Sequence, residues 1–231
     1  MTIAEYLYLW NKNMKHLFLF FLIVNQSLFA QQSSSAGIYR ARFFIDKSLT
    51  NKVLVSTSGG QNNFSGSLFR MPLNYIDSIK QIVEQGVSKE LYAVAECQYL
   101  KRENGKLKST YNSGQYVGGL PKGRKKKAIF SFEKDLYVSL KIRINAFRGV
   151  QVGGTNLNYS KVRPYVFIRI KAFDETRKKV YSKKIRIYDF EKLESVQYSL
   201  GTVSVRNSEI ITPDQICSML KKTFLKMSEK K

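Results

Sequence analysis

Alternating apolar and polar residues mark the clearest strand of the chain. Between Asp135 and Phe147 an apolar side chain occupies every second position, from Leu136 to Ala146. This alternation predicts a strand, because successive side chains of a strand point to opposite faces. Similar patterns, the last interrupted by Gly201, predict further strands at 38–45, 52–57, 90–102, 107–111, 165–173, 179–188 and 197–205.

Two segments carry the apolar spacing of an amphipathic helix. The first covers 73–85, and we predict that it ends at Gly86, since glycine tolerates the left-handed conformation that closes helices. The second follows Thr212, which forms a T-x-x-Q capping box with Gln215. Its apolar stripe is Ile216, Leu220, Phe224 and Met227. Together the elements predict an α+β fold: a mainly antiparallel sheet of about five to seven strands, with two helices packed on one face.

The N-terminal segment has the three parts of a secretory signal peptide. Lys15 and His16 precede an eight-residue apolar run at 17–24, and a more polar stretch ends at Ala30. The run is too short to cross a bilayer, which takes about 20 residues. We therefore expect cleavage near Ala30 and export to the periplasm or cell surface. Whether Met14 is the true start stays open. The predicted organisation is upstream residues and signal peptide at 1–30, a polar leader at 31–37 and a single domain at 38–231.

The chain is strongly basic. Its 39 Lys and Arg against 17 Asp and Glu give a formal charge of +22. Removal of the leader takes away two cations (Lys12, Lys15) and one acid (Glu5), which leaves about +21. Such a charge favours an anionic envelope component or an envelope protein as partner, and a membrane surface fits as well. Nucleic acid is not expected in that compartment, nor is a transmembrane helix after cleavage. The alternative is that the charge serves solubility alone.

The residue types exclude much enzyme chemistry. The chain's single histidine, His16, lies in the leader, so the exported chain has no imidazole for Ser-His, Cys-His or zinc-hydrolase catalysis. Neither a phosphate-binding P-loop nor a dinucleotide fingerprint is present. We predict no catalytic residue, no metal site and no cofactor. The acids at 189, 191 and 194 leave a carboxylate-dependent glycan enzyme as an alternative.

Two cysteines remain after cleavage, Cys97 and Cys217. Export makes a disulfide between them a candidate. Each also lies beside an apolar stripe, where a free thiol packs as a small hydrophobe. Both interpretations stay open.

Two groups of cations are candidates for anion binding. The segment KGRKKK follows Gly119 and Pro121 and is predicted to be a mobile loop; its cations are Lys122, Arg124, Lys125, Lys126 and Lys127. The second group lies on the polar faces of the three strongest strands and comprises Lys141, Arg143, Arg169, Lys171, Lys184 and Arg186. The same faces carry the rings of Tyr137, Tyr165, Phe167 and Tyr188. If the strands are neighbours, the face mixes cations with aromatic rings. An ordinary solvated face, or one covered by a helix, is the alternative.

Segment 89–231 resembles a small α/β envelope domain. The resemblance rests on the strand LYAVAECQYL, the hairpin YVFIRIKAFDETRKKVYSKKIRI and the closing helix PDQICSMLKKTFLKM. They resemble the N-terminal domain of the Tol-system translocation protein TolB and related domains in curli-secretion and penicillin-binding-protein-activator lipoproteins. The turn at 174–177 lacks the Thr-Gly usual in that family. The resemblance implies a non-catalytic scaffold that docks on envelope proteins, and it carries over no functional residue.

These observations favour a non-enzymatic, envelope-associated binding or scaffold module that recognises an anionic polymer, a lipid surface or a partner protein. One alternative is a structural subunit of a periplasmic or outer-membrane complex. The glycan-processing enzyme is the other.

Overall fold

The computed structural model describes residues 34–50, 53–57, 62–63, 70–112, 115–148, 152–153, 157–200, 203–208 and 210–229. Contacts divide the chain into residues 1–34 and 35–231, and all elements below belong to the second unit. The predicted signal peptide lies outside the described residues. In chain order the elements are β1 (Ser35–Ile45), α2 (Lys47–Thr50), β2 (Val53–Thr57), β3 (Asn62–Asn63), α3 (Leu73–Leu91), β4 (Val94–Cys97), α4 (Lys125–Ser131), β5 (Leu136–Arg148), β6 (Val152–Gly153), β7 (Leu157–Phe173), β8 (Lys179–Ile187), β9 (Leu193–Leu200), β10 (Val203–Ser208) and α5 (Pro213–Glu229).

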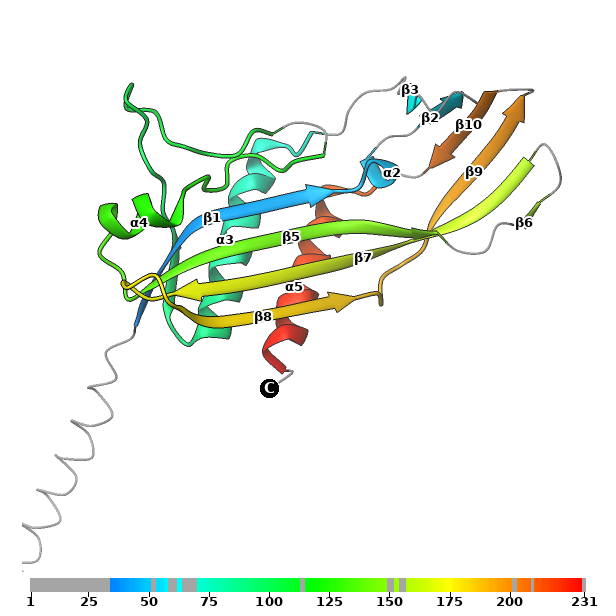
Figure 1. The fold of residues 1–231 in the computed structure, drawn as a ribbon. Coiled ribbons are helices and arrows are strands. Elements are labelled where there is room, and N and C mark those ends of the chain that lie inside the picture. The colour runs from blue at the N-terminus through cyan, green and yellow to red at the C-terminus, as the bar shows by residue number, and fades with distance from the viewer. Residues whose placement is uncertain are drawn as a thin grey trace, which may run out of the picture. The chain divides into compact units, whose positions relative to one another are not determined.

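The described strands form one mixed sheet of ten strands (Figure 1). β1 pairs in parallel with β4 and β5, and every other pairing is antiparallel. The predicted α+β class is confirmed, but the sheet is larger than the predicted five to seven strands. One reason is that β7 begins at Leu157, eight residues before the predicted strand at 165–173, and pairs with β9 and β6 along this added part. The other is that the segment at 197–205 belongs to two strands, β9, which ends at Leu200, and β10, which begins at Val203.

α3 and α5 pack side by side on one face of the sheet, as predicted (Figure 1). Between helices and sheet lies the main core, built from the inward positions of the alternating strands. Its fully buried members include Ile38, Phe43, Ile79, Val83, Ile142, Ile168 and Leu220. Burial of these side chains is the main stabilising contribution, at roughly 1.5–3 kcal/mol for each large aliphatic or aromatic group.

α3 does not end at Gly86, so that prediction is wrong. The helix continues to Leu91 and closes at Tyr92, which takes the left-handed conformation at φ 52°. Gly86 faces α5 instead: a Cβ there would lie 2.4 Å from the ring of Phe224. Glycine therefore serves the close packing of two helices. In the added last turn the buried Glu90 accepts a hydrogen bond from the Lys183 ammonium at 2.7 Å, which ties α3 to β8.

The extension of α3 shortens the next strand. The sequence predicts a strand over 90–102, whereas β4 covers only Val94–Cys97. Alternation still holds locally, since Ala93 and Ala95 are buried in the main core. Between the predicted strands at 90–102 and 107–111 the chain turns, with the Gly105 amide donating to the Arg102 carbonyl at 2.9 Å.

The capping box at the start of α5 is confirmed. The Thr212 hydroxyl oxygen accepts a hydrogen bond from the Gln215 amide at 3.2 Å, and the Gln215 side-chain oxygen accepts one from the Thr212 amide at 2.9 Å. These two bonds satisfy donors that the helix itself leaves unpaired. The predicted apolar stripe is buried: Ile216, Leu220, Phe224 and Met227.

A second, smaller apolar cluster lies on the opposite face of the sheet. There α4 packs against β1 and β5 through the buried Tyr39, Ala128 and Tyr137. The sequence predicts a mobile loop over 122–127, but residues 125–127 form the first turn of α4. The reason lies just beyond the basic run: Ala128, Ile129 and Phe132 supply an apolar side that anchors the segment to the sheet.

Candidate functional site

The register of four neighbouring strands brings cations into one line. Arg42 of β1 lies opposite Lys141 of β5, Lys141 opposite Arg169 of β7, and Arg169 opposite Lys184 of β8. We call these four residues the cation row. Neighbouring strands lie about 4.8 Å apart, so the row crosses about 14 Å of sheet. Arg42 is missing from the sequence-based candidates, although its alternation with Arg40 in β1 was a usable signal.

The next line of the same face alternates aromatic rings with cations. Phe44, Arg143, Phe167 and Arg186 follow one another across β1, β5, β7 and β8, and we call them the ring row. The Arg186 guanidinium lies 5.5 Å from the Tyr165 ring centroid and 5.8 Å from that of Phe167. It also donates a hydrogen bond to the Tyr188 hydroxyl at 3.1 Å. These contacts place the rings of Tyr165, Phe167 and Tyr188 around the Arg186 guanidinium.

A third line completes the surface that we call the outer face. Arg40, Ser139, Lys171 and Ser182 are paired across the same four strands. None of the twelve residues in the three rows is acidic. Among the side chains that the structure describes, none of the row cations pairs with a carboxylate. The face therefore presents an uncompensated array of positive charge.

The charges of the outer face act on one another. Lys141 is at the centre of the array, and desolvation, followed by the charge of Arg143 and the other guanidinium groups beside it, lowers the pKa of its ammonium. Desolvation likewise lowers the pKa of Arg40, and Arg42 adds to the effect. An anion placed over the rows would relieve this repulsion.

One predicted member of the aromatic face is elsewhere. Tyr137 is only 3% exposed, because α4 covers it, and its hydroxyl donates to the Phe132 carbonyl at 2.6 Å. The prediction that Tyr137 lies on the open face is therefore wrong. Tyr165, Phe167 and Tyr188 remain at the surface in part, with Tyr188 44% exposed.

The basic segment 122–127 lies apart from the cation row, at the end of the sheet where β5 begins. The backbone of Lys122 forms an isolated antiparallel β-bridge with Arg40, and the Lys122 ammonium lies 5.3 Å from the centroid of the Tyr111 ring. The Lys125 ammonium lies 4.2 Å from the Phe173 ring, on the side of α4 that faces the sheet. The remaining predicted cations, Arg124, Lys126 and Lys127, are exposed.

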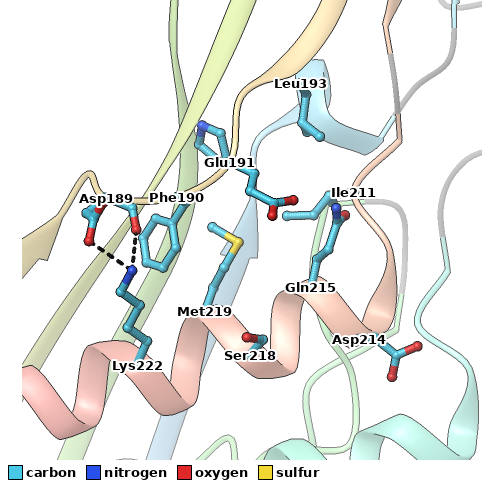
Figure 2. A pocket seen from close by; sticks show the side chains of 11 residues that line it. Asp189, Phe190, Glu191, Leu193, Ile211, Asp214, Gln215, Ser218, Met219 and Lys222 are labelled. Carbon is cyan, nitrogen blue, oxygen red and sulfur yellow. Dashed lines mark hydrogen bonds and ion pairs between the residues drawn. The ribbon is translucent and has the colours of Figure 1, made fainter.

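A pocket of about 670 Å³ lies beside α5 (Figure 2). Its apolar lining includes Phe190, Ile211 and Met219, and its carboxylates are Asp189, Glu191 and Asp214. Glu194, the third acid of the predicted cluster, is not among the lining residues.

The pocket's acids suit a glycan enzyme poorly. Asp189 pairs with Lys222 at 2.9 Å and with Lys226 at 3.4 Å, and these two ammonium groups lower its pKa. Asp214 accepts a hydrogen bond from the Tyr75 hydroxyl at 3.0 Å. A glycosidase needs one carboxyl group whose pKa is raised so that it can donate a proton. No cluster of three or more His, Cys, Asp or Glu suited to a metal occurs among the described residues.

Both cysteines are free thiols in the structure. Cys97 is on β4 and Cys217 on α5, and both are partly buried. Burial raises the pKa of the Cys97 thiol strongly, and the nearby Glu84 carboxylate adds to the shift. Burial raises the pKa of Cys217 less. The candidate disulfide is therefore not formed in this structure.

The chain is therefore an α+β domain with two helices on one side of its sheet and, on the other, a cationic face that α4 covers at one end. Within the described part of the chain, no helix is both long and apolar enough to cross a bilayer. No family model matches the chain, and no curated protein matches it. Among solved structures, the structure of the chain is similar to that of a "putative neuraminyllactose-binding hemagglutinin homolog" from Helicobacter pylori. The TM-score is 0.37 and the sequence identity is 8%, and the match covers 87% of this chain and 83% of that chain. A similarity of this size carries no argument about function.

Proposed function

We propose that this protein is an exported, non-enzymatic binding module that holds an anionic polymer of the cell envelope on its outer face. The observation that carries the proposal is the cation row: strand register aligns four cations, and the three rows contain no acid.

The geometry favours a polymer over a single small anion. Four cations spaced by about 4.8 Å offer a linear array about 14 Å long, which suits a chain with repeated anionic groups. The ring row runs parallel to it and offers Phe44 and Phe167 as apolar surfaces. Sugar rings pack on such surfaces through their apolar faces. A phosphorylated glycan combines both features, since its phosphates match the cation row and its sugars match the rings.

The predicted leader supports the same partner. An exported protein meets phosphorylated and acidic glycans at the envelope. The resemblance of segment 89–231 to envelope scaffold domains agrees with a role without catalysis and stays part of this proposal. The carboxylate enzyme is the weaker alternative, because two of the three pocket acids are held in ion pairs or hydrogen bonds.

Binding to the lipid-free, phosphorylated polysaccharide of lipopolysaccharide tests the proposal, with neutral dextran as the uncharged polymer. The test variant removes three row charges by Arg42→Gln, Lys141→Gln and Arg169→Gln. A matched control removes three exposed charges elsewhere by Lys89→Gln, Lys101→Gln and Lys106→Gln, so both have the same net charge. The row variant should lose affinity for this polysaccharide by about tenfold or more, and the control by no more than about twofold, because each row charge is proposed to contact a phosphate.

Two results would count against the proposal. Equal losses in both variants would show that net charge alone governs binding. Equal retention on dextran and on the phosphorylated polysaccharide at low salt would remove the anionic polymer as ligand. Co-purification of a stoichiometric protein partner that survives high salt would favour the structural-subunit alternative.

A further inference from the structure

α4 and the β7–β8 turn form one surface at the end of the sheet. We call residues 124–134 and 174–179 the α4 tip (Figure 1). The Lys125 ammonium donates a hydrogen bond to the Arg177 carbonyl at 3.1 Å, and the Arg177 guanidinium lies 5.3 Å from the Phe130 ring centroid. These contacts join the helix and the turn into one unit.

Phe130 is the unusual residue of the α4 tip. It is 73% exposed, although its neighbours Ala128 and Ile129 pack toward the sheet. Lys126 and Lys127 precede it by four and three residues, so all three side chains lie on one side of the helix. α4 therefore presents a bare aromatic ring among cations while its other side is fixed to the sheet.

The exposed charge of the α4 tip is mostly positive. Its exposed cations are Arg124, Lys126, Lys127, Arg177, Lys178 and Lys179, and its exposed acids are Glu133 and Glu175. A further acid, Asp174, is used within the turn: its carboxylate accepts hydrogen bonds from the Thr176 hydroxyl at 2.7 Å and the Lys178 amide at 2.9 Å. Six exposed cations against two exposed acids leave a positive surface around Phe130.

We propose that the α4 tip binds an anionic lipid surface and inserts the Phe130 ring at the boundary between headgroups and acyl chains. Cations beside an exposed aromatic ring are the combination that anionic membranes select: the cations meet lipid phosphates, and the ring leaves water. An anionic polymer in solution would use the cations but would offer no acyl layer for the ring. The proposal is independent of polymer binding on the outer face, since no residue of the three rows belongs to the α4 tip.

A tryptophan reporter tests insertion directly. The chain has a single tryptophan, Trp10. Replacing it by Phe and adding Phe130→Trp makes position 130 the site of the chain's only indole. The matched control is Phe147→Trp in the same background. Phe147 is 60% exposed and lies ten residues along β5 from Tyr137, a distance of about 33 Å. Each protein is mixed with vesicles of phosphatidylglycerol and phosphatidylcholine, or of phosphatidylcholine alone.

The expected result with Phe130→Trp is a blue shift of the indole emission, and its quenching by brominated acyl chains, with the anionic vesicles only. The indole introduced by Phe147→Trp should show neither change. Quenching at position 147 but not at position 130 would show that another part of the surface meets the membrane and would overturn the proposal. Binding to anionic vesicles without quenching at position 130 would overturn insertion as well.

Vesicle affinity separates this proposal from the polymer-binding one. Lys126→Gln with Lys127→Gln should weaken co-sedimentation with anionic vesicles by about fivefold per charge. Phe130→Ser should weaken it by about tenfold, whereas Phe147→Ser should leave it unchanged. Adding Arg42→Gln, Lys141→Gln and Arg169→Gln to the Phe130→Trp reporter should weaken binding to the lipid-free polysaccharide yet leave indole quenching by anionic vesicles intact. Unchanged vesicle affinity after both the lysine and the Phe130 substitutions would refute the proposal, whatever the outer face binds.

Discussion

At the level of single residues, Lys141 shows most clearly that charge repulsion on the outer face opposes folding. Partial burial and the guanidinium groups beside it lower the pKa of its ammonium, and the described residues of the three rows supply no acid to balance the charge. Like charges in register across strands disfavour the folded state. An arrangement that opposes stability is expected where function requires it, which is the residue-level argument for a ligand at this position.

The two thiols give a residue-scale prediction about pH. Raised pKa values leave less of the reactive thiolate at a given pH, so both cysteines should react slowly with iodoacetamide near pH 8. Cys217 should react first, because the pKa of Cys97 is raised more. Both rates should rise about tenfold per pH unit between about pH 7 and 9, where the thiols are mainly protonated.

Mass spectrometry after timed labelling reads out both rates, and the unfolded chain serves as control. Unfolding without a reductant should expose two reactive thiols. Finding none would show that Cys97 and Cys217 are joined in a disulfide and would contradict the free thiols of the structure.

At the scale of elements, the contact between α3 and α5 determines how closely the helices approach. Gly86 faces the Phe224 ring with no room for a methyl group. The capping box at Thr212 fixes where α5 begins, and Glu90 ties the end of α3 to β8. A local capping box therefore fixes the start of α5, whereas contacts between residues distant in sequence fix the position of α3.

Gly86→Ala tests this packing. Alanine favours a helix over glycine by about 1 kcal/mol, so an unpacked position would be stabilised. Here the added methyl group overpacks the contact with Phe224, which costs about 1–3 kcal/mol. We expect urea denaturation to show a net loss in the free energy of unfolding.

Two further variants control this prediction. Gln85→Ala changes an exposed position one residue away and should stay within about 0.5 kcal/mol of the parent protein. Phe224→Leu should remove most of the additional loss caused by Gly86→Ala, since a smaller side chain makes room. An increase in stability on Gly86→Ala alone would show that the helices are farther apart than the structure has them.

At the scale of the whole molecule, the charge of +22 is distributed unevenly. The outer face has cations and no acids in its three rows. The described acids that pair with lysines lie outside the three rows. Glu84, Glu90 and Asp189 belong to the helical side or to the chain segment beside it, and Glu96 of β4 pairs with Lys134, next to α4. Because the three rows themselves contain no acid, stability should depend on screening of the outer face.

Thermal unfolding at two salt concentrations checks this dependence. Raising NaCl from about 0.05 M to about 0.5 M shortens the screening length and should raise the Tm by a few degrees, about 2–4 °C for each 1 kcal/mol of relieved repulsion. The variant with Arg42→Gln, Lys141→Gln and Arg169→Gln should gain less than the parent. The control with Lys89→Gln, Lys101→Gln and Lys106→Gln should gain nearly as much as the parent. Equal gains in all three proteins would mean that the rows carry no special repulsion.

Local patterns in the sequence were enough to predict the features that depend only on neighbouring residues. Alternation over 135–147 identified β5 and assigned each residue to a face, because side chains of a strand alternate strictly. The T-x-x-Q pattern placed the start of α5, because a capping box closes within four residues. The basic residues of β5, β7 and β8 could be named as candidates for the same reason.

The folded structure was needed to show which of these residues become neighbours. Register aligned Arg42 with Lys141, and no local pattern encodes which residue lies opposite another. α4 covered Tyr137 but left Phe167 at the surface, although both occupy outward positions of the alternation. Gly86 is a contact between two helices rather than a helix end. The local pattern could not show this, because its partner Phe224 lies 138 residues further along the chain. The face on which a strand residue lies follows from the two-residue period of the strand. The residue that lies opposite it follows from packing between segments that are distant in sequence.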